Sequence, residues 1–160
     1  MDKTQQAAFT MRLTRGGRVC FAVYYDHSVI VACLEKSRKK ELQKQIKGEI
    51  KALAIPLLKW GDFTETAWER YGDRYLHMNT EETICESNQN FEIRYGDIEK
   101  VRLSPYRTET TRSYEDPPIM GQIWFEVYGE KHHFNHKYKR EHPKVGMLRE
   151  LFADRFTLVR

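Results

Sequence analysis

The sequence predicts an α+β fold, in which strands that include a bend are followed by one closing C-terminal helix. Apolar and polar residues alternate over residues 91–95 and again over 123–128, which is the period of half-buried strands. Gly96 and Asp97 interrupt the first run, and an apolar pattern in a new phase follows, so a bend between two strands is expected. A helical pattern over residues 143–156 comes after these strands. Strands followed by one closing helix are typical of α+β folds.

Length and composition predict one globular domain over residues 1–160. The chain is 40% hydrophobic and 31% charged, which suits a folded protein with a well-charged surface. The first residues lack an apolar signal segment and no run approaches a membrane span, so a cytoplasmic protein is expected. The odd number of cysteines argues against a disulfide framework, and Cys20, Cys33 and Cys85 are expected to be small buried groups.

The amino-terminal part predicts three paired strands. Residues 8–14 alternate with the period of a strand, and Gly16-Gly17 supplies a turn because glycine reaches positive φ without a steric penalty. Residues 19–25 and 29–34 are β-branched and aromatic on both faces. Such strands are expected to be paired with each other and covered on two sides.

A basic amphipathic helix is predicted at about residues 35–60. Apolar residues recur at helical spacing in this segment, and Pro56 is expected to kink or end the helix. The segment has eight basic and three acidic residues, and the candidates for contact with an anionic surface are Lys36, Lys40, Lys44, Lys47 and Lys51. The favoured interpretation is a helix that covers the sheet and leaves its lysines in solvent. The alternative is a helix lying on anionic lipid, whereas nucleic acid is not expected because the helix lacks interleaved aromatics.

The central region mixes helical and strand patterns. Residues 62–71 fit either a capped helix or an alternating strand, and the strand is favoured; residues 75–78 also fit a short strand. Asn79 and the acidic residues after it predict the start of a helix. Ile84 and Cys85 are expected on the buried side of that helix.

The strand over residues 122–128 turns two large aromatic side chains away from the predicted core. Ile123, Phe125 and Val127 are expected inside, which leaves Trp124 and Tyr128 outside as candidate interface residues. Cover by another part of the same chain is the favoured alternative to contact with a second protein.

The segment from residue 75 to residue 156 resembles the pleckstrin-homology-like (PH-like) domains of bacteria and archaea, including GRAM-like members. The resemblance is carried by Phe91, Ile93, Tyr95, Ile98 and Val101, followed by the loop, the strand pair and the terminal helix. It implies a strongly bent antiparallel sheet or barrel closed by that C-terminal helix, and a binding or scaffolding role. Members of this family bind phosphoinositides, proteins or no known ligand, and the basic helix at 35–60 departs from the family's simplest form.

Motifs of common enzymes are absent from the sequence. It contains no GxxxxGK[ST], GxGxxG, HExxH or GxSxG, so an enzyme is not the expected class, and no cofactor is expected. His132, His133 and His136 lack accompanying cysteine or carboxylate ligands, and a metal site is not expected. Candidates for binding a phosphate or an acidic peptide are Arg107, Arg112, Lys131, His133 and Lys137.

Three functional hypotheses remain from the sequence. The leading hypothesis is a non-catalytic PH-like module that binds a protein, an anionic phospholipid headgroup or a second copy of itself. The first alternative is a peripheral membrane protein that uses the basic helix at 35–60. The second alternative is an enzyme of an unrecognised type.

Overall fold

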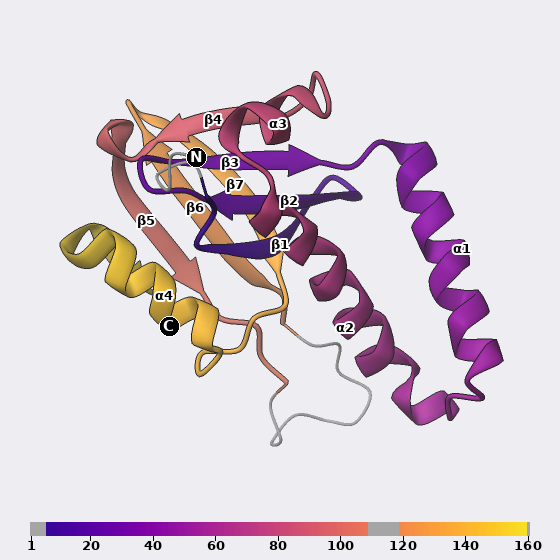
Figure 1. Ribbon diagram of the computed structural model, residues 1–160. Coiled ribbons are helices and arrows are strands. Elements are labelled where there is room, and N and C mark those ends of the chain that lie inside the picture. The colour runs from indigo at the N-terminus through magenta and orange to yellow at the C-terminus, as the bar shows by residue number, and fades with distance from the viewer. Residues whose placement is uncertain (1–5, 109–118, 160) are drawn as a thin grey trace. The chain divides into compact units, whose positions relative to one another are not determined.

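A computed structural model describes residues 6–108 and 119–159 of the chain (Figure 1). The structure is 42% helical and 35% strand, so the predicted α+β class is confirmed. The chain divides into two compact units, each described here by itself. Unit 1 comprises Met1–Arg12 and Gly16–Glu92, and unit 2 comprises Leu13–Arg15 and Ile93–Arg160.

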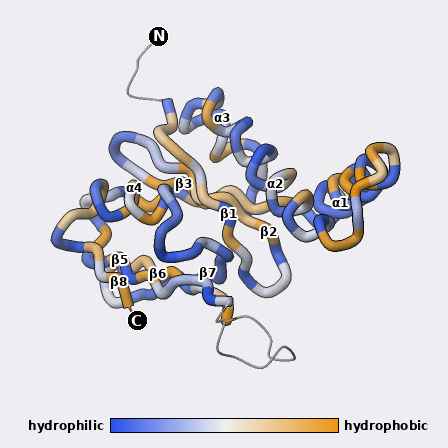
Figure 2. The backbone as a smooth tube through the Cα atoms, turned by 90° about the horizontal axis from the view of Figure 1, so that it is seen from below, coloured by the Kyte–Doolittle hydropathy of each residue, from blue (hydrophilic) through white to orange (hydrophobic). Residues whose placement is uncertain are grey.

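Unit 1 contains the predicted amino-terminal strands. These strands are β1 (Phe9–Arg15), β2 (Arg18–Tyr24) and β3 (Ser28–Cys33). A later strand, β4 (Phe91–Arg94), pairs with β3, so the order is β4-β3-β2-β1. Gly16 and Gly17, at φ 57° and 79°, make the turn between β1 and β2. Hydrophobic residues run along β2 and β3 (Figure 2), and both faces of these two strands are buried, as the sequence predicts.

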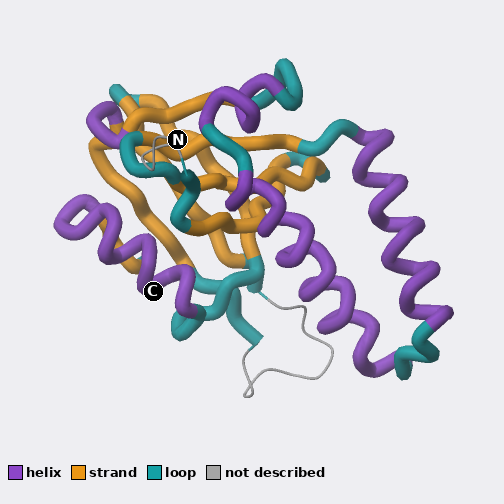
Figure 3. Tube along the Cα trace, in the orientation of Figure 1, coloured by secondary structure: helices purple, strands orange, loops and turns teal. Residues whose placement is uncertain are grey.

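Helices make up the rest of unit 1 (Figure 3). They are α1 (Lys36–Ala52), the 3₁₀ turn η2 (Leu57–Lys59), α2 (Trp60–Gly72), the 3₁₀ turn η3 (Asp73–His77) and α3 (Thr80–Cys85). The predicted helix at 35–60 therefore ends eight residues early. Ala54 lies at a positive φ of 52°, which stops the helix, and Pro56 disfavours helical geometry at the residue before it.

The core of unit 1 shows why residues 62–71 are helical and why the favoured strand is wrong. Phe63, Ala67 and Tyr71 are spaced by four residues and pack, with Trp68, against the apolar face of β2 and β3. A helix gathers these four side chains on one face, whereas a strand would place Trp68 on the face opposite the other three. The short strand expected over 75–78 is likewise wrong, because this segment is the turn η3.

The cover over this face of β2 and β3 comes mainly from segments after α1. In α1 only Ile46 is buried among the described side chains, and it lies beside α2. Helix α3 is attached through Thr83, whose hydroxyl lies 2.6 Å from the Tyr25 hydroxyl, and burial raises the pKa of Tyr25. The capping box at Asn79 confirms the predicted start of α3. Cys85 is exposed, which corrects the expectation that it is buried.

Unit 2 contains the second of the two predicted bent strands and the hairpin that follows it. Its elements are the 3₁₀ turn η4 (Tyr95–Asp97), β5 (Ile98–Ser104), β6 (Gly121–Val127), β7 (Glu130–His136), α4 (Pro143–Phe152), the 3₁₀ turn η5 (Ala153–Arg155) and β8 (Phe156–Leu158). Their strands pair in the order β7-β6-β5-β8, and Thr14 of β1 lies opposite Asn135 of β7. The bend at η4 is stabilised by Arg155, whose guanidinium donates to the carbonyls of Tyr95 (2.6 Å) and Ile98 (3.0 Å).

The C-terminal helix is shorter than predicted. Helix α4 buries Val145, Leu148 and Phe152, but the chain then leaves the helix at Ala153, where φ is 48°. Phe156–Leu158 forms β8, which pairs in parallel with β5. The predicted helix over 143–156 is therefore wrong in its last four residues, because the 3₁₀ turn η5 and the first residue of β8 replace the final α-helical turn.

The strands do not close into a barrel. In the strand order of the described residues, β4 and β8 each have one strand neighbour, so the pairing is open at both ends. The α+β class is confirmed, the two strands are interrupted at Tyr95–Asp97 as predicted, and closure of the sheet is a correction to the sequence prediction.

Candidate functional site

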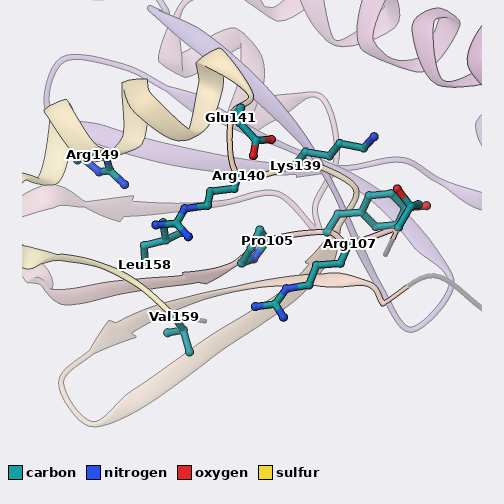
Figure 4. Close-up of a pocket in the computed structure, with 10 residues that line it drawn as sticks. Pro105, Arg107, Lys139, Arg140, Glu141, Arg149, Leu158 and Val159 are labelled. Atoms are coloured by element: carbon teal, nitrogen blue, oxygen red, sulfur yellow. The ribbon is translucent and has the colours of Figure 1, made fainter. Parts of the chain in front are cut away.

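A basic pocket in unit 2 is the strongest candidate for a functional site. Its volume is about 570 Å³, and four cationic side chains and one carboxylate lie among its described lining residues. The residues that line it are Pro105, Tyr106, Arg107, Thr108, Lys139, Arg140, Glu141, Arg149, Leu158 and Val159. Figure 4 shows the charged groups coming from separate segments, with the side chains of Lys139 and Arg140 extending in opposite directions.

Backbone hydrogen bonds fix the segment after β5, which forms one wall of this pocket. The amide of Tyr106 donates to the carbonyl of Tyr138 at 2.9 Å. Arg107 exchanges two backbone hydrogen bonds of 3.0 Å with Ile119. The main chain that carries the Arg107 side chain is therefore held from both sides.

The turn between β7 and α4 forms the second wall. The amide of His142 donates to the carbonyl of Lys139 at 3.0 Å, which closes the turn. The His142 side chain then accepts from the amide of Lys144 at 3.1 Å and caps α4, with Pro143 in the first turn. This cap sets the direction of α4.

Arg149 and the end of β8 complete the pocket. Arg149 projects from α4, and its guanidinium carbon lies 5.9 Å from the centre of the Phe156 ring. The amide of Val159 donates to the carbonyl of Leu103 at 2.7 Å, so the apolar wall made by Leu158 and Val159 is bonded to β5. Apolar surface thus lies beside the guanidinium groups.

His136 links the two segments that form the walls of the pocket. Its side chain is only 2% exposed, and its Nδ1 accepts from the amide of Tyr138 at 2.9 Å. Because Nδ1 is an acceptor, the proton is on Nε2, which donates to the carbonyl of Ser104 at 3.0 Å. Burial lowers the pKa of His136 to about 4, so the neutral ring connects the ends of β5 and β7.

The charges of the pocket favour an anion. Arg107, Lys139, Arg140 and Arg149 outnumber Glu141, and within the described ranges neither Lys139 nor Arg140 forms a salt bridge. Guanidinium groups present planar pairs of N–H donors that match phosphate and carboxylate oxygens. The pocket therefore offers both the charge and the hydrogen-bond donors that an oxyanion needs.

Of the predicted ligand-binding residues that the structure describes, only Arg107 lines this pocket. Lys131 and Lys137 are exposed on and just after β7, and neither lines it. The His133 ring stacks on Trp124 at a centroid distance of 5.1 Å. Arg112 lies outside the described residues.

Three cationic residues of the pocket were not predicted from the sequence, namely Lys139, Arg140 and Arg149. A clue to the first two is the basic run over residues 137–140, which stands directly before the helix at Pro143. Arg149 has no such local clue, because it reaches the pocket through the packing of α4.

The two candidate interface residues have different surroundings. Trp124 is half-buried on the face of β6 between His133 and Arg102, whose guanidinium carbon lies 5.9 Å from the indole ring. Side chains of unit 2 itself thus cover part of its ring. Tyr128 is 72% exposed in the β6–β7 turn, and its hydroxyl donates to Asp97 at 2.7 Å.

The lysines of α1 form one continuous basic face in unit 1. At 100° per residue, the five candidate residues fall within an arc of about 80° around the helix axis. They are Lys36, Lys40, Lys44, Lys47 and Lys51, and all five are exposed. This face lies away from the stripe of Leu42, Ile46 and Ile50, which packs in the core of unit 1.

Comparisons with known proteins give no relative. No protein-family model, curated protein or solved structure matches the chain. Each helix in the described part of the chain is too short or too polar to cross a lipid bilayer. Among those same residues, no three histidine, cysteine or acidic side chains gather in an arrangement that could hold a metal ion.

Proposed function

We propose that the protein is a non-catalytic, PH-like binding module whose unit 2 holds a phosphate-bearing ligand in the basic pocket. The observation that carries the proposal is the convergence of Arg107, Arg140 and Arg149 on one pocket from three separate segments. The resemblance of residues 91–101 to PH-like domains agrees with such a role, because some members of that family bind phosphoinositides.

The size and lining of the pocket suit a small phosphorylated compound or a lipid headgroup. Ligand pockets commonly enclose about 300 to 1,000 Å³, and this one has about 570 Å³. A phosphate accepts several hydrogen bonds at once, which matches a set of guanidinium donors better than a single carboxylate does. Because the arginines are reached by solvent, binding should weaken as salt screens their charge.

The lining residues favour binding over catalysis. Glu141 supplies the one carboxylate among the described lining residues, and the remaining charged groups are one lysine and three arginines. General acid–base chemistry needs a group that gains and loses a proton near the working pH. The proposed role of the pocket is therefore to hold a phosphate without transforming it.

Titration calorimetry with defined probes tests this proposal. The probes are inorganic phosphate, a soluble inositol polyphosphate, and vesicles with or without a phosphoinositide. Arg140→Gln and Arg149→Gln should each weaken binding by about tenfold, because each removes charge-assisted hydrogen bonds. Arg38→Gln, an exposed arginine of α1 in unit 1, is the matched control and should change little.

The pattern across the probes distinguishes the two sources of phosphate. Tighter binding of the soluble compound indicates a metabolite, whereas binding to phosphoinositide vesicles alone indicates a headgroup. Absence of binding to every probe, or equal loss in the control, would refute the pocket. Release of phosphate from a probe by the wild-type protein, lost in Arg140→Gln, would show that the module is an enzyme.

A further inference from the structure

The connection between α1 and α2 presents an apolar surface to solvent. This connection, residues 53–60, is called the hairpin tip below. Its exposed fractions are 63% for Leu53, 70% for Leu57, 97% for Leu58 and 45% for Trp60. Figure 2 shows hydrophobic residues gathered where the two helices are joined. Four large apolar side chains in eight consecutive residues form a patch rather than scattered exposure.

Local hydrogen bonds give the hairpin tip a fixed shape. The Trp60 indole donates to the carbonyl of Ile55 at 2.7 Å, and the amide of Ile55 donates to Ile50 at 3.0 Å. The amide of Lys59 donates to the carbonyl of Pro56 at 2.8 Å within the turn η2. The backbone is thus ordered before any partner binds, which lowers the entropic cost of binding.

Lysines surround this apolar patch. Lys51 lies in the last turn of α1 and Lys59 stands between Leu58 and Trp60, and both are exposed. Lys47 lies one turn before Lys51 on the lysine face of α1, which continues for about 22 Å along the helix. Exposed apolar side chains with lysines next to them in the chain match the combination of acyl chains and anionic headgroups at a membrane surface.

We propose that the hairpin tip inserts into the surface of a bilayer containing anionic lipid. In this arrangement Leu57, Leu58 and Trp60 enter the boundary between headgroups and acyl chains, and Lys51 and Lys59 bind the headgroups. Neither contribution is strong alone, but a combination of apolar insertion and basic charge gives stable attachment. The rest of the lysine face adds attraction over about one Debye length.

Charge favours an anionic bilayer over a second copy of the chain as the partner of the hairpin tip. Two hairpin tips meeting each other would bring the lysines at positions 51 and 59 of both copies together, and like charges repel. In an anionic bilayer, the negatively charged headgroups attract the same lysines. The proposal uses residues of unit 1 alone and does not depend on the phosphate pocket of unit 2.

Vesicle co-sedimentation of the full chain tests the proposal. The vesicles are pure phosphatidylcholine and phosphatidylcholine mixed with phosphatidylserine. Wild-type protein should sediment with the mixed vesicles, and much less with the neutral ones, and raised salt should weaken binding. Leu57→Ser with Leu58→Ser should lower the partition coefficient by at least about tenfold, because two apolar side chains no longer enter the bilayer.

Charge variants separate local contact from the general effect of net charge. Lys51→Glu with Lys59→Glu should reduce binding by at least about twentyfold, since each lysine contributes about fivefold near such a surface. Lys100→Glu with Lys131→Glu makes the same change in net charge at exposed strand residues of unit 2 and should have a much smaller effect. Tryptophan emission should shift to the blue on binding, and Trp60→Phe should remove the shift.

Several results would overturn the proposal. These are absence of binding to phosphatidylserine vesicles, unchanged binding of the serine variant, or equal loss in the Lys100 and Lys131 control. A dimer detected by sedimentation equilibrium, and dissociated by the serine substitutions, would show instead that a second copy covers the tip. The phosphate-pocket variants Arg140→Gln and Arg149→Gln should keep vesicle binding, which distinguishes failure of this proposal from failure of the pocket.

Discussion

Acid should destabilise the protein through His136. The ring is buried, and its neutral form accepts a hydrogen bond from Tyr138 and donates one to Ser104. Burial lowers the folded-state pKa to about 4, whereas an unfolded histidine has a pKa near 6.5. The unfolded state therefore takes up the proton first as the pH falls. The stabilising contribution is complete above about pH 6.5 and is lost progressively as the pH falls towards 4.

The size of this effect follows from the two pKa values. A difference of about 2.5 units corresponds to about 3 kcal/mol of unfolding free energy when both states are fully protonated. About 2 kcal/mol of this is already lost at about pH 5. A typical domain has a stability of about 5 to 15 kcal/mol, so the loss should be plain in an equilibrium experiment.

Urea unfolding followed by circular dichroism, at a series of pH values, measures the contribution. His136→Gln removes the titrating ring but keeps a donor and an acceptor, and the difference between wild type and variant cancels the effect of carboxylates. Between neutral pH and about pH 5, the unfolding free energy of the wild type should fall by about 2 kcal/mol more than that of the variant. His27→Gln removes an exposed histidine and is the control. A difference that does not vary with pH would refute the buried, neutral assignment of His136.

Two further predictions concern contacts within single units, one made by the Arg155 side chain and one by the backbone at Gly72. Arg155→Met should lower the unfolding free energy by about 1 to 3 kcal/mol, because the carbonyls of Tyr95 and Ile98 lose a charged donor. Arg149→Met, which removes an exposed arginine, should change it by less than about 0.5 kcal/mol, and equal losses in thermal or urea unfolding would contradict this role of Arg155. Gly72→Ala should cost about 1 to 3 kcal/mol, since a Cβ there would lie 2.9 Å from the Phe21 ring. Gly48→Ala, with open space around its Cβ, should instead stabilise α1 by up to about 1 kcal/mol, and a stabilising Gly72→Ala would show that the Phe21 ring yields easily.

The phosphate pocket illustrates how far sequence reasoning reaches towards a site. Arg107 was a candidate because it follows a strand in a polar segment, and it does line the pocket. Lys139, Arg140 and Arg149 join it because strand pairing places the ends of β5 and β7 close together and α4 carries Arg149 to the same pocket. The spacing of these residues along the chain does not predict that they line one pocket. Their arrangement depends on strand pairing and on the packing of Val145, Leu148 and Phe152.

Unit 1 shows the same limit for secondary structure and exposure. The alternating residues of β1, the glycines after it and the lysine face of α1 are all local patterns, and they were predicted correctly. Residues 62–71 fit both the helical and the strand period in isolation, and the strand period was favoured. Packing of Phe63, Ala67 and Trp68 on β2 and β3 decides between them, because burial of a shared apolar face outweighs local preference.

The sequence by itself determined the α+β class, the bend around Gly96, and the lysine-rich amphipathic character of residues 36–52. These features depend on neighbouring residues alone, through backbone sterics and the periods of helix and strand. Only the tertiary structure decided that the strands stay open, that three arginines meet at one pocket, and that Leu57 and Leu58 remain in solvent. Those outcomes depend on contacts between segments that are far apart in the sequence, and local residue patterns do not show which segments make contact.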